Sequence, residues 1–211
     1  MKTLKSTITV LLAVFSTCIF AQTTANDGIR EAAIKGKSDL VKILSENKEF
    51  NFGVSAREVE ASQITNPIES FYTNFERLLN DTTGNINGIS GSEQKFIVPF
   101  SIDNQVITTV SVASNSKGSK AVELVNQQYK AELNQLPAEI RRANYRGLKF
   151  IRVPNIEASL YIFEEKCYTS YKGGNLREGI NISEMTRKLQ IDAREFQAKF
   201  GEELKRGKLV R

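Results

Sequence analysis

The residue that offers the most obvious chemistry is Cys167, in the stretch FEEKCYTSYKGG, with Lys166 beside it and Glu164 and Glu165 just before it. A neighbouring ammonium group activates a thiol only when the thiol is exposed. On a strand, adjacent side chains point to opposite faces, so a solvent-facing Lys166 places Cys167 in the interior. We therefore predict that Cys167 is a small buried apolar side chain and not a nucleophile.

The chain contains no histidine, and this absence excludes several kinds of site. Ser-His-Asp triads and Cys-His dyads need an imidazole to accept the proton of the nucleophile. Zinc and copper sites need clustered His and Cys, and thioredoxin-like exchange needs a second thiol. We therefore expect a non-enzymatic protein with no catalytic residues, no metal ligands and no cofactor.

Carboxylates are the main catalytic groups that remain. A glycosidase-like pair of acids could be drawn from Asp103, Glu157, Glu164 or Glu165. The chain has 24 Asp and Glu residues, and their spacing selects no two of them. Solvated surface carboxylates are therefore the simpler interpretation.

Basic and aromatic residues are interleaved in the stretch IRRANYRGLKFIR, which contains no acid. Arginine side chains bind carboxylates and phosphates well, and aromatic rings add stacking. The alternative is a solvent-facing junction between a helix and a strand. The pattern predicts an anion- or partner-binding surface made of Arg141, Arg142, Tyr145, Arg146, Lys149 and Arg152.

Residues 1–21 are typical of a secretory signal peptide, with Lys2 and Lys5 before a short apolar run and a small residue at Ala21. We expect cleavage near Ala21 and a periplasmic or secreted protein. The alternative is a lipoprotein anchored through Cys18. No other apolar run approaches the roughly 20 residues of a membrane span, so none is expected in the mature chain.

The charge of the chain does not indicate a nucleic-acid partner. The net charge is +5, and loss of Lys2 and Lys5 with the signal lowers it to +3. Much of that excess lies in the C-terminal KRGKLVR, which leaves the body of the chain nearly balanced. A protein or an anionic extracellular ligand is the expected partner, and the sequence does not indicate an oligomeric state.

The hydrophobic pattern predicts an α+β fold, with a mostly antiparallel sheet of about four to five strands packed against helices that include a C-terminal amphipathic helix. Residues 22–211 are expected to form a single domain. Its predicted parts are an N-terminal helical region 26–80, a flexible loop 81–94, a sheet-and-helix region 95–182, and a C-terminal helix 183–206 with a basic tail.

Individual elements follow from the spacing of apolar residues. In chain order the spacing predicts a helix over 26–47 interrupted at Gly36, a helix over 67–79, a strand hairpin over 96–112, a helix over 121–136, a second strand pair over 148–171, and a last helix capped by Ser183.

The layout KFIVPFSIDNQVITTVSV, then a helix, then LKFIRVPNIEASLYIF, resembles uncharacterised exported bacterial α+β domains. It is also similar to the pro-domains and inhibitors of some secreted proteases, in which a strand hairpin precedes a helix that packs on the sheet. The resemblance covers about Phe52 to Tyr171 and transfers no functional residue.

The sequence therefore favours an exported, non-enzymatic domain that binds a protein or an extracellular ligand. Two alternatives remain: a protease-inhibitor or pro-domain-like module, and a carboxylate-based hydrolase.

Overall fold

The computed structural model describes residues 26–47, 49, 52–81, 86, 91 and 95–205. The predicted signal peptide with Cys18, and the basic tail from Arg206 onward, lie outside these residues. Among the residues described, no helix is both long and apolar enough to cross a membrane.

One nine-stranded sheet organises the chain, so the predicted α+β class is confirmed and the predicted four to five strands are wrong. The strands are β1 (Gln63–Ile64), β2 (Ile68–Tyr72), β3 (Lys95–Ile102), β4 (Gln105–Asn115), β5 (Gly118–Glu123), β6 (Lys149–Val153), β7 (Ala158–Phe163), β8 (Lys166–Tyr168) and β9 (Ile180–Asn181).

The sheet has the order β5-β4-β3-β2-β6-β7-β8-β9, with β1 paired to β3. The strands from β2 to β5 form one antiparallel run, and those from β6 to β9 form another. The two runs meet where β2 and β6 pair in parallel, with Tyr72 opposite Arg152. This mostly antiparallel arrangement confirms the predicted sheet type.

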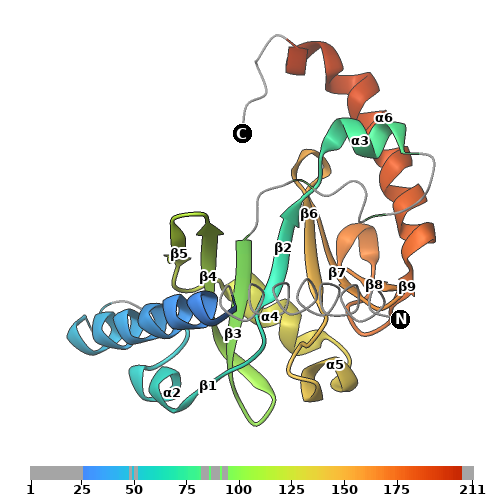
Figure 1. Cartoon of the computed structure of the whole chain (residues 1–211). Helices are drawn as coiled ribbons and strands as arrows, with labels where there is room; N and C mark the ends of the chain where they lie inside the picture. The colour runs from blue at the N-terminus through green and yellow to red at the C-terminus, as the bar shows by residue number, and fades with distance from the viewer. Residues whose placement is uncertain are drawn as a thin grey trace, which may run out of the picture.

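Helices cover both faces of the sheet (Figure 1). They are residues 26–46, α2 (Ala56–Ala61), α3 (Phe75–Asn80), α4 (Gln127–Gln135), α5 (Ala138–Arg142) and α6 (Ile182–Lys205). Helix 26–46 packs on β3 and β4, and α6 packs with α3 over β6 to β8, on the same face. The opposite face, which carries Ile97 and Phe150, packs against α4 and α5.

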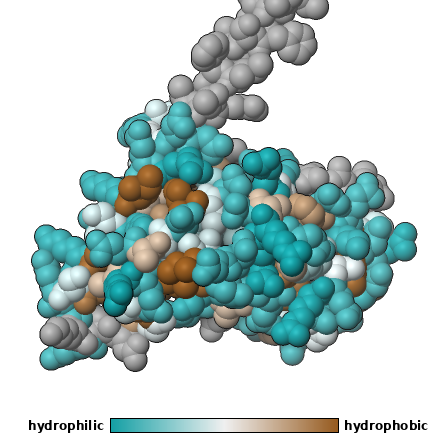
Figure 2. Space-filling model, turned by 90° about the horizontal axis from the view of Figure 1, so that it is seen from below, coloured by the Kyte–Doolittle hydropathy of each residue, from teal (hydrophilic) through white to brown (hydrophobic). Residues whose placement is uncertain are grey.

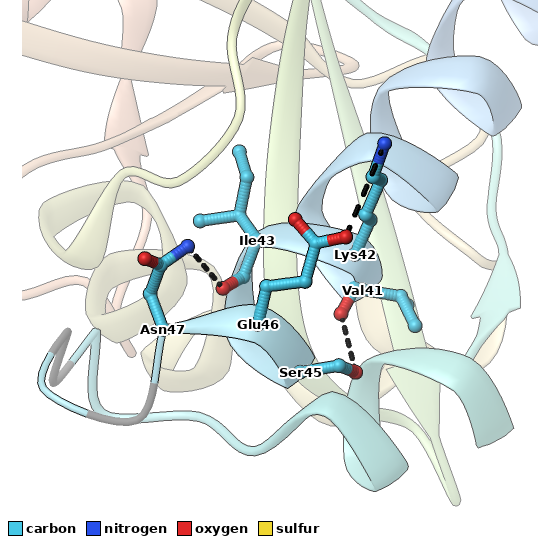
Figure 3. Close-up of polar contacts among 6 residues, drawn as sticks. All are labelled: Val41, Lys42, Ile43, Ser45, Glu46 and Asn47. Carbon is cyan, nitrogen blue, oxygen red and sulfur yellow. Dashed lines mark hydrogen bonds and ion pairs between the residues drawn. The ribbon is translucent and has the colours of Figure 1, made fainter.

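Helix 26–46 is continuous through Gly36, so the predicted interruption is wrong. Gly36 lies close against the sheet, because a Cβ there would be 2.9 Å from Val110 Cγ1. Asn47 directly follows the last helical residue, and its Nδ2 donates to the carbonyl oxygen of Ile43 at 3.2 Å. Figure 3 shows this contact beside the Ser45 hydroxyl, which donates to the Val41 carbonyl, and the Lys42–Glu46 pair.

Two segments predicted as helices are strands. Residues 68–72 form β2 inside the predicted helix 67–79, and helix α3 begins only at Phe75. Residues 118–123 form β5, and helix α4 begins only at Gln127, where Asn126 caps it. In both segments, pairing with neighbouring strands overrides a helix-like spacing of apolar residues.

Other element predictions are confirmed. The hairpin turns at Asp103 and Asn104, β6 and β7 pair antiparallel, and the last helix spans Ile182–Lys205. Its cap is Asn181 rather than Ser183, because Asn181 Oδ1 accepts the backbone N–H of Ser183 at 2.8 Å. Within the predicted loop 81–94, Ile86 is buried and the Gly91 N–H donates to the Tyr72 carbonyl at 2.6 Å.

Candidate functional site

Cys167 belongs to the core, as predicted. Its side chain is fully buried on β8 within the cluster beneath α6, and Lys166 before it is exposed. Burial raises the pKa of the Cys167 thiol from 9.0 to about 12. A thiol that holds its proton this strongly is a poor nucleophile near neutral pH.

The six residues of the predicted basic surface do not form one surface. Tyr145 is 1% exposed and lies in the core beneath α5. Lys149 and Arg152 are three residues apart on β6, so the pleat directs them to opposite faces. Arg141, Arg142 and Arg146 lie at the end of α5 and in the turn after it, where Arg141 Nε donates to the Leu136 carbonyl.

The acids considered for catalysis occupy turns. Asp103, Glu157 and Glu164 all have positive φ, a conformation typical of tight turns. Glu157 lies in the β6–β7 connection, at the end of the sheet opposite to the turns of Asp103 and Glu164. The turn positions account for these acids, and Glu157 is too far along the sheet to pair with Asp103 or Glu164. In addition, no group of three His, Cys, Asp or Glu side chains that could hold a metal ion occurs in the part of the chain that the structure describes.

A polar hollow of about 270 Å³ lies beside α4, over the middle of the sheet. We call it the Tyr129 hollow. Its lining comes from β2, β3, β4, β5 and α4, and consists of Ser70, Tyr72, Lys95, Phe96, Ile97, Ser111, Val122, Glu123 and Tyr129.

Cross-strand pairing explains how distant residues meet in the Tyr129 hollow. Residues directly opposite each other on paired strands share one face of a sheet. Ser111 lies opposite Glu123 on one side and opposite Ile97 on the other. In the next row, Lys95 lies opposite Ser70. The Asn126 cap begins α4 and thereby sets Tyr129 in its first turn above this row.

Glu123 and Lys95 line the hollow, and Arg152 lies next to this lining, so the charge changes from negative to positive across the sheet. The Glu123 carboxylate on edge strand β5 accepts hydrogen bonds from Ser111 Oγ at 2.7 Å and from Asn126 Nδ2 at 3.1 Å. Lys95 lies two strands away on β3, with its ammonium 5.2 Å from the centroid of the Tyr72 ring. Arg152 is exposed opposite Tyr72, on β6.

The pKa of Tyr129 is affected by the charges at both ends of the hollow. Burial, followed by the negative charge of Glu123, raises the pKa of the Tyr129 phenol to about 12, while the positive charge of Arg152 lowers it. Both charges therefore act on the Tyr129 hydroxyl, and Arg152 is the one residue of the predicted basic surface that lies beside the hollow. The Tyr129 phenol remains protonated at neutral pH.

A buried acid lies next to the hollow on the inner side of α4. Glu132 is only 7% exposed, and its carboxylate accepts hydrogen bonds from Tyr161 Oη at 2.9 Å and from Gln128 Nε2 at 2.9 Å. Burial raises the pKa of Tyr161 far above its usual value, and Glu132 raises it further. The Tyr161 hydroxyl is thus a fixed donor, and it holds α4 on the sheet.

A second cleft, of about 320 Å³, lies between α6 and the loop at Tyr171. Its ionisable groups are already engaged with one another. The Asp192 carboxylate accepts the Tyr171 hydroxyl at 2.8 Å and pairs with Lys172, while Lys188 pairs with Glu184 at 2.9 Å. The Tyr171, Lys172, Lys188 and Asp192 side chains of this cleft therefore already have partners within the protein.

Large apolar docking surfaces are not apparent on the face seen from below, where Figure 2 shows small hydrophobic patches separated by hydrophilic side chains. The large hydrophobic side chains that are exposed among the described residues are Ile34, Val122 and Ile191, on three different elements. This scattering favours recognition through a polar hollow over an extended apolar interface.

Spacing along the chain gave no signal for most of this hollow. Its residues come from five separate segments and meet only through the strand register. Glu132, which lies next to the hollow and does not line it, does leave a signal: it falls at a helical step between Tyr129 and Leu136, where an acid in an apolar stripe indicates a buried polar contact.

Comparison of the chain with protein-family models, with curated proteins and with solved structures gives no significant match. The chemistry of the Tyr129 hollow is therefore the basis for inferring function.

Proposed function

We propose that the protein is an exported, non-enzymatic binding module that holds a small extracellular ligand in the Tyr129 hollow. The observation that carries the proposal is the lining of this hollow, where two tyrosine rings, two serine hydroxyls, a carboxylate and a lysine converge. Sites for small molecules combine apolar walls with a few placed polar groups in this way. Export rests on the signal-like residues 1–21.

Binding without catalysis fits the roles of the nearby acids. Glu123 and Glu132 are carboxylates whose negative charges act on the Tyr129 phenol, and each already accepts two hydrogen bonds from neutral donors. General acid–base catalysis instead needs a group free to exchange a proton with the substrate. The same contacts give the hollow a fixed shape, which reduces the entropic cost of binding.

The test is a ligand-observed NMR screen of the mature chain against a library of sugars, organic acids, amino acids and short peptides. Val122 is 55% exposed at the rim, so Val122→Trp places a bulky ring over the hollow without disturbing the core. Ile34→Trp adds the same ring at a position that is 50% exposed, on the helix 26–46 across the sheet.

Hits that Val122→Trp abolishes and Ile34→Trp leaves intact support the proposal. Binding that survives Val122→Trp unchanged would place the site elsewhere. Chemical conversion of a bound compound during prolonged incubation would make the protein an enzyme and overturn the non-enzymatic part. Protection of a protease in a direct activity assay would support the inhibitor-like alternative instead.

A further inference from the structure

We propose that the ligand of the Tyr129 hollow is a single sugar ring that carries one carboxylate, that is, a hexuronic acid. This inference rests on the proposed binding function and names the ligand class for the same site. It follows from the charge layout, the hydroxyl lining, the tyrosine rings and the size of the hollow.

The charge layout selects a ligand with one negative end. Arg152 is exposed and forms no ion pair with any other residue of the described chain, and its guanidinium can receive a carboxylate through two parallel hydrogen bonds. Lys95 adds a second positive charge on the same side of the hollow. The anionic group of the ligand therefore belongs at the β2–β6 end.

Glu123 excludes ligands that are negative throughout. A phosphate or a dicarboxylate that fills the hollow would bring a like charge towards this carboxylate, which is unfavourable. An ionised carboxylate has about four lone-pair sites, and Ser111 and Asn126 occupy two of them. The remaining sites can accept hydrogen bonds from sugar hydroxyl groups at the β5 end.

The walls suit a sugar ring in between. Tyr72 and Tyr129 contribute aromatic rings to the lining, and aromatic rings pack well against the C–H groups of a ring that is polar at its edge. The Ser70 and Ser111 hydroxyls can both donate and accept hydrogen bonds. At about 270 Å³, the hollow lies just below the range of roughly 300–1,000 Å³ for drug-sized ligands, which favours one ring over an oligomer.

The test titrates the ¹⁵N-labelled mature chain with glucuronic acid and galacturonic acid, and with glucose and galactose as matched rings that lack the carboxylate. Inorganic phosphate and free phenylalanine serve as a multivalent anion and a zwitterion. The variants are Arg152→Gln and Glu123→Gln, and Arg142→Gln is the control, because Arg142 is exposed on α5 away from the hollow.

We expect amide shifts at Tyr72, Ser111 and Tyr129 with a uronic acid, and weaker shifts with the neutral sugar. Arg152→Gln should weaken uronic acid binding at least about threefold and leave neutral sugar binding unchanged. Added salt should weaken uronic acid binding only. Glu123→Gln should weaken both kinds of sugar, and Arg142→Gln neither.

Other outcomes separate the two proposals. Equal binding of acidic and neutral sugars, or stronger binding of phosphate or phenylalanine, overturns the uronic acid assignment and leaves the hollow as a ligand site. Uronic acid shifts that map away from the hollow also overturn it. If no sugar binds, but other library compounds bind and Val122→Trp abolishes their binding, only the ligand class is wrong. If neither screen yields a ligand of the hollow, both proposals fail.

Discussion

Val110 lies directly beneath Gly36, and a Cβ on Gly36 would be only 2.9 Å from Val110 Cγ1. The same Cβ would lie 3.0 Å from Ala121 Cβ and 3.2 Å from Leu124 Cδ2. Val110 is fully buried, and the methyl group of Ala121 is attached directly to the backbone, so neither can move aside easily. The glycine thus allows helix 26–46 to pack closely on β4 and β5.

Gly36→Ala should therefore lower the free energy of unfolding, by about 1 kcal/mol net. Alanine gains about 1 kcal/mol of helix propensity, but overpacking costs about 1–3 kcal/mol. Gly28→Ala, in the same helix, is the control because its Cβ would meet Ser119 Oγ only at 3.5 Å. Urea denaturation should show Gly28→Ala neutral or stabilising. Equal stabilisation by both changes would contradict the close packing at Gly36.

Long alternating runs made the sheet partly predictable. In β3, β4, β6 and β7, β-branched and aromatic residues alternate over a buried face, and the chain turns at Asp103-Asn104, so local pattern and tertiary pairing agree. The edge strand β5 lacks such agreement. Its residues GSKAVE favour helix as much as strand, and only pairing with β4 decides between them.

The candidate site was less predictable than the fold. The interleaved arginines predicted an anion-binding surface, but Tyr145 is core and the pleat separates Lys149 from Arg152. What brings Arg152 to the Tyr129 hollow is the parallel pairing of β6 with β2, some 80 residues earlier in the chain. No local spacing encodes such a pairing, since it depends on how the two antiparallel runs join.

Cys167 should react with a thiol reagent only after denaturation, because its side chain is fully buried and its pKa is raised to about 12. Labelling with iodoacetamide at pH 8, followed by mass spectrometry, measures this. Ser170→Cys in a Cys167→Ala background is the matched control, because Ser170 is exposed three residues further on. The control should be labelled in the native state, and rapid native labelling of Cys167 would contradict the burial.

Stability should fall above about pH 9. Burial raises the pKa of Cys167 from 9.0, and those of Tyr129 and Tyr145 from 10.0, each to about 12. Between these values the folded chain binds more protons than the unfolded chain, so the free energy of unfolding decreases with rising pH. Below about pH 8 these groups do not change the free energy of unfolding with pH.

Urea denaturation between about pH 8 and pH 12 measures the effect, and Cys167→Ala should reduce the dependence of the free energy of unfolding on pH between pH 9 and 10. A stability that rises with pH in this window would contradict the prediction.

Tyr161 and Glu132 should behave as a coupled pair in a double-mutant cycle. Tyr161→Phe removes the hydroxyl that donates to the buried Glu132 carboxylate at 2.9 Å, and Glu132→Leu leaves the fully buried Tyr161 hydroxyl without its acceptor. Each single change leaves a buried polar group unsatisfied, which costs about 1–3 kcal/mol. The double variant replaces both partners by apolar groups, so it should be less destabilised than the sum of the single variants, with a coupling energy of about 1 kcal/mol or more. Additive effects in urea denaturation would show that the contact contributes little to stability.

Since the Tyr161–Glu132 pair holds α4 on the sheet, the single variants should also shift the amide resonance of Tyr129 in the first turn of that helix. An unshifted resonance would show that the pair does not affect the position of Tyr129 in the hollow.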